Sequence, residues 1–368
     1  MIDSTAIDRA LNRAIDQNFI PGAILAFGQQ RTPLYCRVFG NATLHPSPQP
    51  MRVETIFDLA SLTKVLGTTL VAMKLFEEGE IDLDRPLGDY LKSHYPADKA
   101  ALTPRHLLVH AAGFPPSITF YKGLLPEPDA PGARRQSILE QVRQVGLIYP
   151  PGSESQYSDL GMILFGDLLE QLSGMSLDHL YQERVAAPLE LPDTFFIHLD
   201  RPLPHAQRPL ESFAATEECA WRDRIVRGQV HDENAYLLRG VAGHAGLFSS
   251  VSDLQKLSCA LLAAMAGESD FLTSSTLELF TRRQGLVPGS DRALGWGTPI
   301  PGASCGCHFS PRAIGHTGFT GTSIWIDPER ERFVLLLTNR VHPSRQDTGF
   351  LSFRPQLHDL VVEALNHL

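Results

Sequence analysis

Segments with β-strand patterns are confined to the two ends of the chain, and this distribution limits the possible folds more than any other feature. Residues 23–27 and 34–39 are short β-prone runs joined by a polar connection. Near the other end, 322–326 and 333–339 flank a polar turn and predict an antiparallel hairpin. Residues 80–240 instead contain helix-like segments separated by Pro and Gly. We therefore predict an α+β fold with one antiparallel sheet, built from both chain ends and flanked by helices, and a mostly helical insertion.

This pattern predicts two domains. An α/β-sheet domain would contain residues 1–79 and 241–368, and residues 80–240 would form the helical domain, with an active site between them. Hydrophobic periodicity and Pro or Gly stops predict helices at 7–20, from about Ser61 to 79, 103–113, 137–145, 160–172, 254–265 and 356–368. The same reading predicts a strand at 292–296 and an irregular loop at 114–131 that forms part of a pocket wall.

Composition narrows the class of partner. The 368 residues are 43% hydrophobic and 20% charged, which is ordinary for a globular protein with a sizeable core. The formal net charge of −9 provides no basic field for nucleic acid or for an anionic membrane. We expect a small-molecule or short-peptide substrate, and the sequence leaves the oligomeric state open.

The compartment is predicted from two features. No apolar run approaches the ~20 residues that a membrane span requires, and the first residues lack the pattern of a signal peptide. The five cysteines are odd in number and scattered, unlike a disulfide framework. We expect a reducing cytoplasm, with a periplasmic location still open if the sequence is a mature or trimmed form.

Ser61 and Lys64 form the strongest local signal for chemistry. A helix beginning near Ser61 places both side chains on one face, one turn apart, so that the lysine amine lies within hydrogen-bond reach of the serine hydroxyl. A lysine that serves as a base needs a depressed pKa, and the surrounding apolar residues favour one. Such a pair activates a serine without a histidine.

Two later motifs, together with Ser61 and Lys64, form a set that can be compared with known families. The three stretches, in chain order, are Ser61-Leu62-Thr63-Lys64, Tyr157-Ser158-Asp159 and His316-Thr317-Gly318. In their order and composition they resemble the signatures of the penicillin-recognising serine hydrolases, the family of class C β-lactamases, DD-peptidases and related esterases. The resemblance extends to 107–113, 149–152, 188–191 and 246–249, and it implies a β-lactamase/DD-peptidase-like fold.

The resemblance also implies catalytic roles. Ser61 would attack a carbonyl carbon and form an acyl-enzyme that water later cleaves. Lys64 would lower the pKa of Tyr157, whose phenolate would act as base toward Ser61 and then as acid toward the leaving group. The backbone N–H groups of Ser61 and Phe319 would form the oxyanion hole. No cofactor and no metal are implied.

The substrate-binding residues depart from the family pattern at two positions. Asp159 stands where the family has an asparagine, so it would accept a hydrogen bond from a substrate amide or ammonium, or hold Lys64 charged. His316 stands in place of a lysine and loses a fixed positive charge, so recognition of a substrate carboxylate by His316, Thr317 and Gly318 would be weaker or pH-dependent. Both changes point away from a dedicated β-lactamase.

A further stretch resembles a subgroup that includes N-acetylmuramyl-L-alanine amidases. It comprises residues 230–235 and the Gly-rich 240–248, in which Glu233 and His244 are possible substrate-binding residues. A tightly packed connection with a buried histidine explains the same pattern equally well.

Other possible metal-binding clusters are interpreted as structural. Cys305, Cys307 and His308 lack a second pair of ligands at suitable spacing, so surface thiols are expected. His106 and His110 lie four residues apart but lack the glutamate of a helical zinc motif.

The leading prediction is a serine hydrolase that cleaves an amide or ester bond through an acyl-Ser61 intermediate. Its expected substrates are cell-wall muropeptides or D-amino-acid peptides. A carboxylesterase with weak β-lactamase activity, and a silent penicillin-binding or sensor module, remain alternatives.

Overall fold

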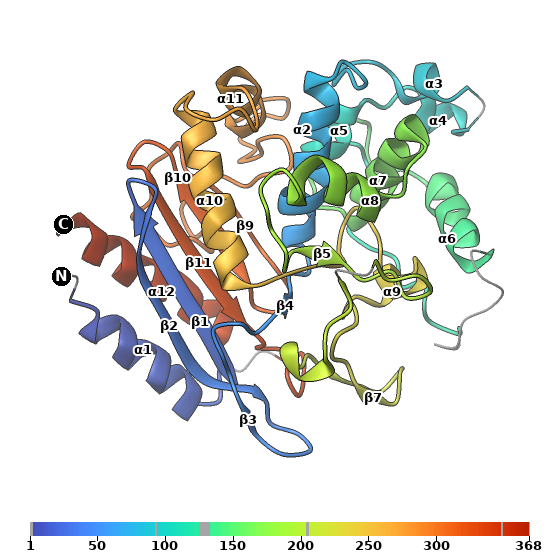
Figure 1. Ribbon diagram of the computed structural model, residues 1–368. Helices are drawn as coiled ribbons and strands as arrows, with labels where there is room; N and C mark the ends of the chain where they lie inside the picture. The colour runs from blue at the N-terminus through green and yellow to red at the C-terminus, as the bar shows by residue number, and fades with distance from the viewer. Residues whose placement is uncertain (1–2, 93, 125–132, 204–205, 347–348, 368) are drawn as a thin grey trace.

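A six-stranded antiparallel sheet forms one half of the molecule (Figure 1). The computed structural model describes residues 3–92, 94–124, 133–203, 206–346 and 349–367. The strand order is β3-β2-β1-β11-β10-β9, so that strands from the two ends of the chain meet at the centre, where Ala23 of β1 pairs with Thr338 of β11. These strands are β1 (Gly22–Gln29), β2 (Thr32–Thr43), β3 (Gln49–Pro50), β9 (Ile314–Thr317), β10 (Ser323–Asp327) and β11 (Arg332–Thr338).

Helices cover both faces of this sheet, which explains why β1 reads as a continuous apolar run. Leu25 and Phe27 pack with α1 (Thr5–Asp16) and α12 (Phe350–Asn366). Their neighbours Ile24 and Ala26 point to the opposite face and join the main core, which includes α10 (Val251–Met265). The two terminal helices contact each other, and both chain ends lie on this side (Figure 1).

The other half of the molecule is mainly helical, as predicted. Its helices form a group beside the sheet (Figure 1). Two further small sheets contain only very short strands. The remaining elements are α2 (Leu70–Glu77), α3 (Leu87–Tyr90), α4 (Ala97–Ala100), α5 (Pro104–Leu108), α6 (Ala133–Gln144), α7 (Asp159–Ser173), α8 (Leu177–Tyr181), α9 (Glu233–Leu237), α11 (Ser274–Thr281), the π-helices η1 (Lys64–Thr69) and η2 (Gln182–Ala186), the 3₁₀-helix η4 (Leu210–Ser212), β4 (Phe57–Asp58), β5 (Phe195–Phe196), β6 (Glu218–Cys219), β7 (Arg224–Ile225) and β8 (Leu247–Ser249).

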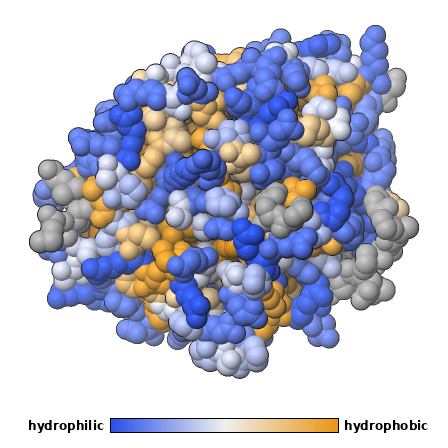
Figure 2. Space-filling view, in the orientation of Figure 1, coloured by the Kyte–Doolittle hydropathy of each residue, from blue (hydrophilic) through white to orange (hydrophobic). Residues whose placement is uncertain are grey.

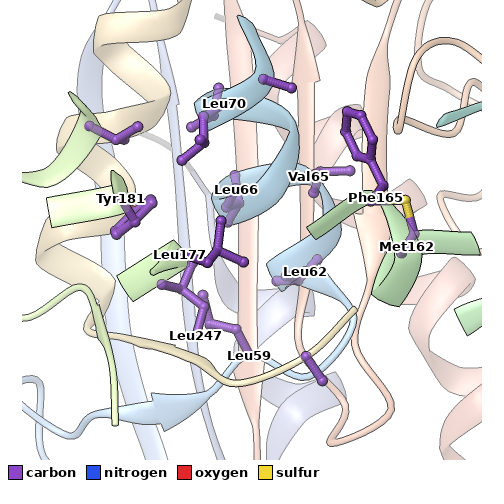
Figure 3. Close-up of a cluster of buried hydrophobic side chains, with 14 of the residues drawn as sticks. Leu59, Leu62, Val65, Leu66, Leu70, Met162, Phe165, Leu177, Tyr181 and Leu247 are labelled. Carbon is purple, nitrogen blue, oxygen red and sulfur yellow. The ribbon is translucent and has the colours of Figure 1, made fainter. Parts of the chain in front are cut away.

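The helical segment that follows Ser61 lies at the centre of the main core. Figure 3 shows Leu66 directed toward Leu177 and Tyr181, while Val65 points toward Phe165 on the other side. All these side chains are fully buried or nearly so. Each buried aliphatic side chain contributes about 1.5–3 kcal/mol relative to exposure, so the segment that bears Lys64 is fixed from several sides.

Several predicted boundaries and one predicted strand are wrong. The expected strand at 292–296 is a tight turn, because Gly295 has φ +81° and the Ala293 N–H bonds the Trp296 carbonyl. The helix predicted over 103–113 ends at Leu108, because the chain turns at His110, which has φ +56°. The final helix begins at Phe350, six residues before the start predicted at 356, and it contains Pro355. The predicted hairpin is confirmed by the pairing of β10 with β11.

The visible surface is mixed, with hydrophilic residues over most of the face and smaller hydrophobic areas between them (Figure 2). In the described part of the chain, none of the helices combines the length and the apolar character of a membrane span. The division into domains at 79 and 240 stays a prediction. Of the expected 114–131 loop, residues 114–124 are irregular and the rest lie outside the described residues.

Candidate active site

Ser61 follows a strained turn that links β4 to the central helical segment. Ala60 has φ +47°, an unfavourable conformation for a residue with a side chain, and its N–H donates to Asp58 Oδ1 at 2.8 Å. The Lys64 ammonium then donates to Ser61 Oγ, also at 2.8 Å. The structure therefore brings together the two side chains whose contact the sequence motif predicts.

Lys64 is completely buried and surrounded by acceptors. Its Nζ lies 2.8 Å from Asp159 Oδ1 and 3.0 Å from the carbonyl oxygen of His244, and 4.9 Å from the centre of the Tyr157 ring. Burial lowers the pKa of Lys64, but the Asp159 carboxylate and the Tyr157 hydroxyl outweigh it and raise that pKa above its usual value. The depressed pKa predicted for this lysine is therefore wrong, because Asp159 supplies a counter-charge.

The start of α7 delivers Tyr157 and Asp159. Ser158 caps the helix by accepting from the Gly161 N–H, and its hydroxyl also donates to the Pro115 carbonyl at 2.7 Å. The adjacent Asp159 N–H bonds the Pro116 carbonyl. These contacts fix the backbone at the start of α7, and with it the positions of Tyr157 and Asp159.

Tyr157 lies between charged and aromatic groups. Its ring centre is 4.7 Å from that of His110 and 5.7 Å from that of His316, and the Arg292 guanidinium lies 5.6 Å away. Burial raises the pKa of Tyr157 more than the neighbouring Lys64 ammonium lowers it, so the net shift is upward. The phenolate expected from the resemblance is thus disfavoured in this resting arrangement.

The third motif lies at the end of β9 and lines the same pocket as Ser61. Gly318 packs so closely that a Cβ there would meet the Leu59 carbonyl oxygen at 2.4 Å. His316 Nδ1 lies 2.9 Å from the Thr317 carbonyl oxygen, and burial, with the charges of Lys64 and Arg292, lowers the pKa of His316 to about 3. His316 is therefore neutral at physiological pH, so it offers no pH-dependent charge to a substrate carboxylate.

Both candidate oxyanion-hole donors are available. Across the described ranges of the chain, the backbone N–H groups of Ser61 and Phe319 donate no hydrogen bond to protein. Ser61 and Phe319 both line the same pocket, and the Phe319 side chain is 47% exposed. Their N–H groups match the requirement for free donors at a developing oxyanion.

This pocket has a volume of about 500 Å³ and opens beside Ser61. Arg292, Arg340 and Arg354 contribute to its wall, and none of them was identified from the sequence as a binding residue. No local pattern in the sequence marks these three arginines, because they lie more than twenty residues from the third motif. The full lining is Ser61, Tyr157, Asp291, Arg292, Gly297, Thr298, Ile300, Ala303, Ser304, Gly315, His316, Thr317, Gly318, Phe319, Trp325, Arg340, Leu351 and Arg354.

Glu233 and His244 do not line this pocket. Glu233 is buried against the Arg345 guanidinium, and His244 is 1% exposed with Nε2 at 2.9 Å from Asp232 Oδ1. His244 contributes to the site through its backbone carbonyl, which accepts from Lys64. The packed-connection interpretation therefore describes these two side chains better than direct substrate binding.

The residues considered for metal binding have other roles. His106 Nδ1 contacts the Thr103 hydroxyl within a helix cap, and His110 Nδ1 accepts from the Ser158 N–H at 3.2 Å. Cys305 is fully buried, so the prediction of a surface thiol is wrong for this residue, whereas Cys307 is exposed.

Comparisons with known proteins found similar sequences and similar structures. A family model described as Beta-lactamase matches residues 7–351. The N-acetylmuramyl-L-alanine amidase of Bacillus subtilis (strain 168) is 32% identical, with 91% of this chain and 80% of that protein aligned. A putative D-alanyl-D-alanine carboxypeptidase of Escherichia coli (strain K12) is 30% identical, over 91% and 82% of the two chains. The octameric penicillin-binding protein homologue from Pyrococcus abyssi has a similar structure, with a TM-score of 0.73, 20% identity, and 98% and 78% of the chains covered.

Proposed function

The chain belongs to the Beta-lactamase family, and from this premise we propose that it is a serine amidase that cleaves a cell-wall muropeptide or a D-amino-acid peptide. The observation that carries the proposal is the contact of Ser61 Oγ with the buried Lys64 ammonium, beside Tyr157. A serine held in this way can form a covalent acyl-enzyme without a histidine.

The charge state of Lys64 defines its role. Asp159 holds it as an ammonium, so it stabilises negative charge on Ser61 Oγ and on the Tyr157 oxygen rather than removing a proton itself. Tyr157, which is neutral at rest, passes protons: its oxygen takes the proton of Ser61 while its own proton moves to the leaving nitrogen. In the second half of the reaction water loses its proton by the same route in reverse, and Ser61 is regenerated.

The position of Tyr157 also indicates where the leaving group of the substrate would bind. Because the leaving nitrogen receives its proton from Tyr157, the rest of the leaving group extends into the pocket that Tyr157 lines with Arg292 and Thr317. A guanidinium in a partly enclosed pocket favours a carboxylate. Peptides released from cell-wall material carry such carboxylates, and the names of both sequence relatives denote cleavage of an amide bond to alanine.

The esterase alternative has support of its own. Ile300 and Leu351 line the same pocket and are 40% and 50% exposed, so an apolar leaving group would also find contacts there. A silent sensor module is less consistent with the site, because Ser61, Lys64 and Tyr157 are all present and in contact. We keep a reducing cytoplasm as the proposed compartment, since the five cysteines are unpaired.

The first test is labelling of Ser61. The wild-type protein and Ser61→Ala are incubated with a fluorophosphonate probe, and the intact masses are measured. We expect one adduct on the wild type and none on a folded Ser61→Ala variant. An adduct of equal yield on the variant would exclude Ser61 as the nucleophile.

The second test addresses the substrate. Hydrolysis of N-acetylmuramyl-L-alanine is compared with that of its C-terminal amide, for the wild type and for Arg292→Ala. We expect Arg292→Ala to raise KM roughly 10- to 150-fold for the carboxylate and to leave KM for the amide unchanged, since the loss of one charge-assisted hydrogen bond costs about 1.5–3 kcal/mol and each 1.4 kcal/mol is a factor of ten. Turnover of an uncharged p-nitrophenyl ester with no detectable hydrolysis of N-acetylmuramyl-L-alanine or of its C-terminal amide would favour the esterase.

A further inference from the structure

The two oxyanion-hole donors come from segments that are far apart in the sequence. Ser61 follows β4, and Phe319 follows β9. Two hydroxyls join these segments: Thr320 Oγ1 donates to the Asp58 carbonyl at 2.8 Å, and Thr322 Oγ1 donates to the Leu59 carbonyl at 3.1 Å. These bonds hold the backbone, but they do not contact the Phe319 side chain.

His231 contacts both segments. Its backbone N–H donates to Asp58 Oδ2 at 2.6 Å, and Asp58 Oδ1 accepts from the N–H of Ala60, the residue before the nucleophile. Its imidazole ring stacks on Phe319, with ring centres 5.7 Å apart and planes at 21°. His231 therefore contacts the segment that carries the Ser61 N–H and also the residue that carries the second N–H, Phe319.

His231 is itself held firmly. Its Nε2 lies 3.1 Å from Glu217 Oε2, and the Arg222 guanidinium donates to its carbonyl oxygen at 2.9 Å. Arg345 binds Glu217 and also lies 5.9 Å from the Phe319 ring. Because His231 is only 4% exposed, it does not line the pocket and does not reach a substrate there.

We infer that His231 is a positioning residue that fixes the distance between the Ser61 and Phe319 N–H groups. The inference rests on the proposed acyl-Ser61 mechanism. An oxyanion hole stabilises the transition state only when its donors are already oriented, so a small displacement of one donor reduces kcat. Phe319 is 47% exposed, and the stack on His231 restricts the motion of its ring.

The test compares His231→Ala with His231→Phe. Both variants keep the backbone N–H that bonds Asp58, and only His231→Phe keeps a ring for the stack. For each variant, kcat and KM are measured with p-nitrophenyl acetate, and the Kd of phenylboronic acid is measured because its tetrahedral adduct with Ser61 places an oxygen in the oxyanion hole.

For His231→Ala we expect kcat to fall on the order of 10- to 100-fold with KM within twofold of the wild type. The Kd of the boronate should rise by the same factor as kcat/KM falls. His231→Phe should retain more activity than His231→Ala, because the stack is preserved. All rates are divided by the concentration of sites that the fluorophosphonate labels, so that loss of folded protein does not imitate the effect.

Three outcomes separate the explanations. A boronate Kd and a kcat within twofold of the wild type in His231→Ala would overturn the positioning role. If His231→Ala does not fold, His231→Leu replaces it, because leucine fills part of the space without a ring for the stack. Equal losses of kcat and of boronate affinity in His231→Leu support the inference, and values within twofold of the wild type overturn it. A wild-type protein that the fluorophosphonate does not label at Ser61 would instead contradict the proposed function.

Discussion

The Lys64 ammonium lies 2.8 Å from the Asp159 carboxylate, inside a site where the lysine side chain has no contact with solvent. The same nitrogen contacts Ser61 Oγ at equal distance. Asp159 raises the pKa of Lys64, and it adds to the larger effect of burial in raising the pKa of Tyr157, so one carboxylate influences the protonation of both groups. A family signature with an asparagine at this position would lack that control.

Asp159→Asn should therefore move the pH dependence of acylation to lower pH. Removal of the negative charge lowers the pKa of both Lys64 and Tyr157, so the cluster loses a proton more readily. The measurement is kcat/KM for p-nitrophenyl acetate from pH 5 to 10. Glu154→Gln, an equal charge change at an exposed position nearby, is the matched control. A pH profile that does not move would show that Asp159 leaves the protonation of this cluster unaffected.

The same variant also tests substrate preference. An asparagine amide can donate as well as accept, so Asp159→Asn should increase the ratio of nitrocefin hydrolysis to ester hydrolysis. An unchanged ratio would mean that Asp159 does not face the substrate.

His316 should not titrate in the working range of the enzyme. Burial lowers its pKa to about 3, so it stays neutral between pH 5 and 8. We expect His316→Gln to change kcat/KM for a carboxylate substrate by the same factor at every pH in that range. A factor that varies more than about threefold would reveal a charged histidine and would restore the pH-dependent recognition expected from the sequence.

The stability of the protein should fall in mild acid. His358 is fully buried between Ser304 and Ser323, and burial lowers its pKa to about 3. The unfolded chain takes up this proton near pH 6.5, before the folded state does, so the free energy of unfolding decreases as the pH falls from 6.5 toward 3. The contribution is about 1.4 kcal/mol per pH unit for one histidine.

Urea unfolding at pH 7, 6 and 5 measures this effect. His358→Gln should show a smaller pH dependence than the wild type, whereas His308→Gln, at an exposed position, should match it. Equal slopes in His358→Gln and the wild type would contradict the assignment.

Gly166→Ala should weaken both stability and activity. A Cβ at Gly166 would lie 2.9 Å from the Gly243 backbone, and the next residue, His244, accepts a hydrogen bond from Lys64. We expect a loss of about 1–3 kcal/mol in the free energy of unfolding and a lower kcat for the folded protein. Gly146→Ala is the control, since no atom lies within 4 Å of the added methyl group. Wild-type stability in Gly166→Ala would mean that this contact relaxes freely.

Local signals in the sequence were sufficient for β1, β2, β10 and β11, but not for the short strands β3 and β9. Two strand-like runs on either side of a polar turn identified the hairpin of β10 and β11, and Thr103-Pro104 identified the start of α5. The end of α5 was not predictable in this way, because the chain turns at His110 to meet the Gln156 N–H, a contact with a distant segment. Such contacts leave no periodic pattern.

The charges of the site were predicted only in part, because the sequence suggested that Asp159 could hold Lys64 charged but did not indicate an arginine in the pocket. The pKa of Lys64 depends on Asp159, and the pocket charge depends on Arg292, in a turn that reads as a strand. The contribution of His244 comes from its carbonyl, which every residue possesses, so its side-chain chemistry was a misleading guide. The motifs identified side chains that the structure brings together, while the pKa shifts of these side chains follow from burial and from neighbouring charges.

The pairing of β1 with β11 has a consequence for synthesis on the ribosome. β1 emerges early, yet one of its two edges acquires its partner only when the strand near the opposite terminus has been translated. Until then the nascent chain exposes an apolar strand edge of the kind that promotes aggregation. We expect this protein to depend on chaperones during translation more than a chain whose neighbouring strands are consecutive.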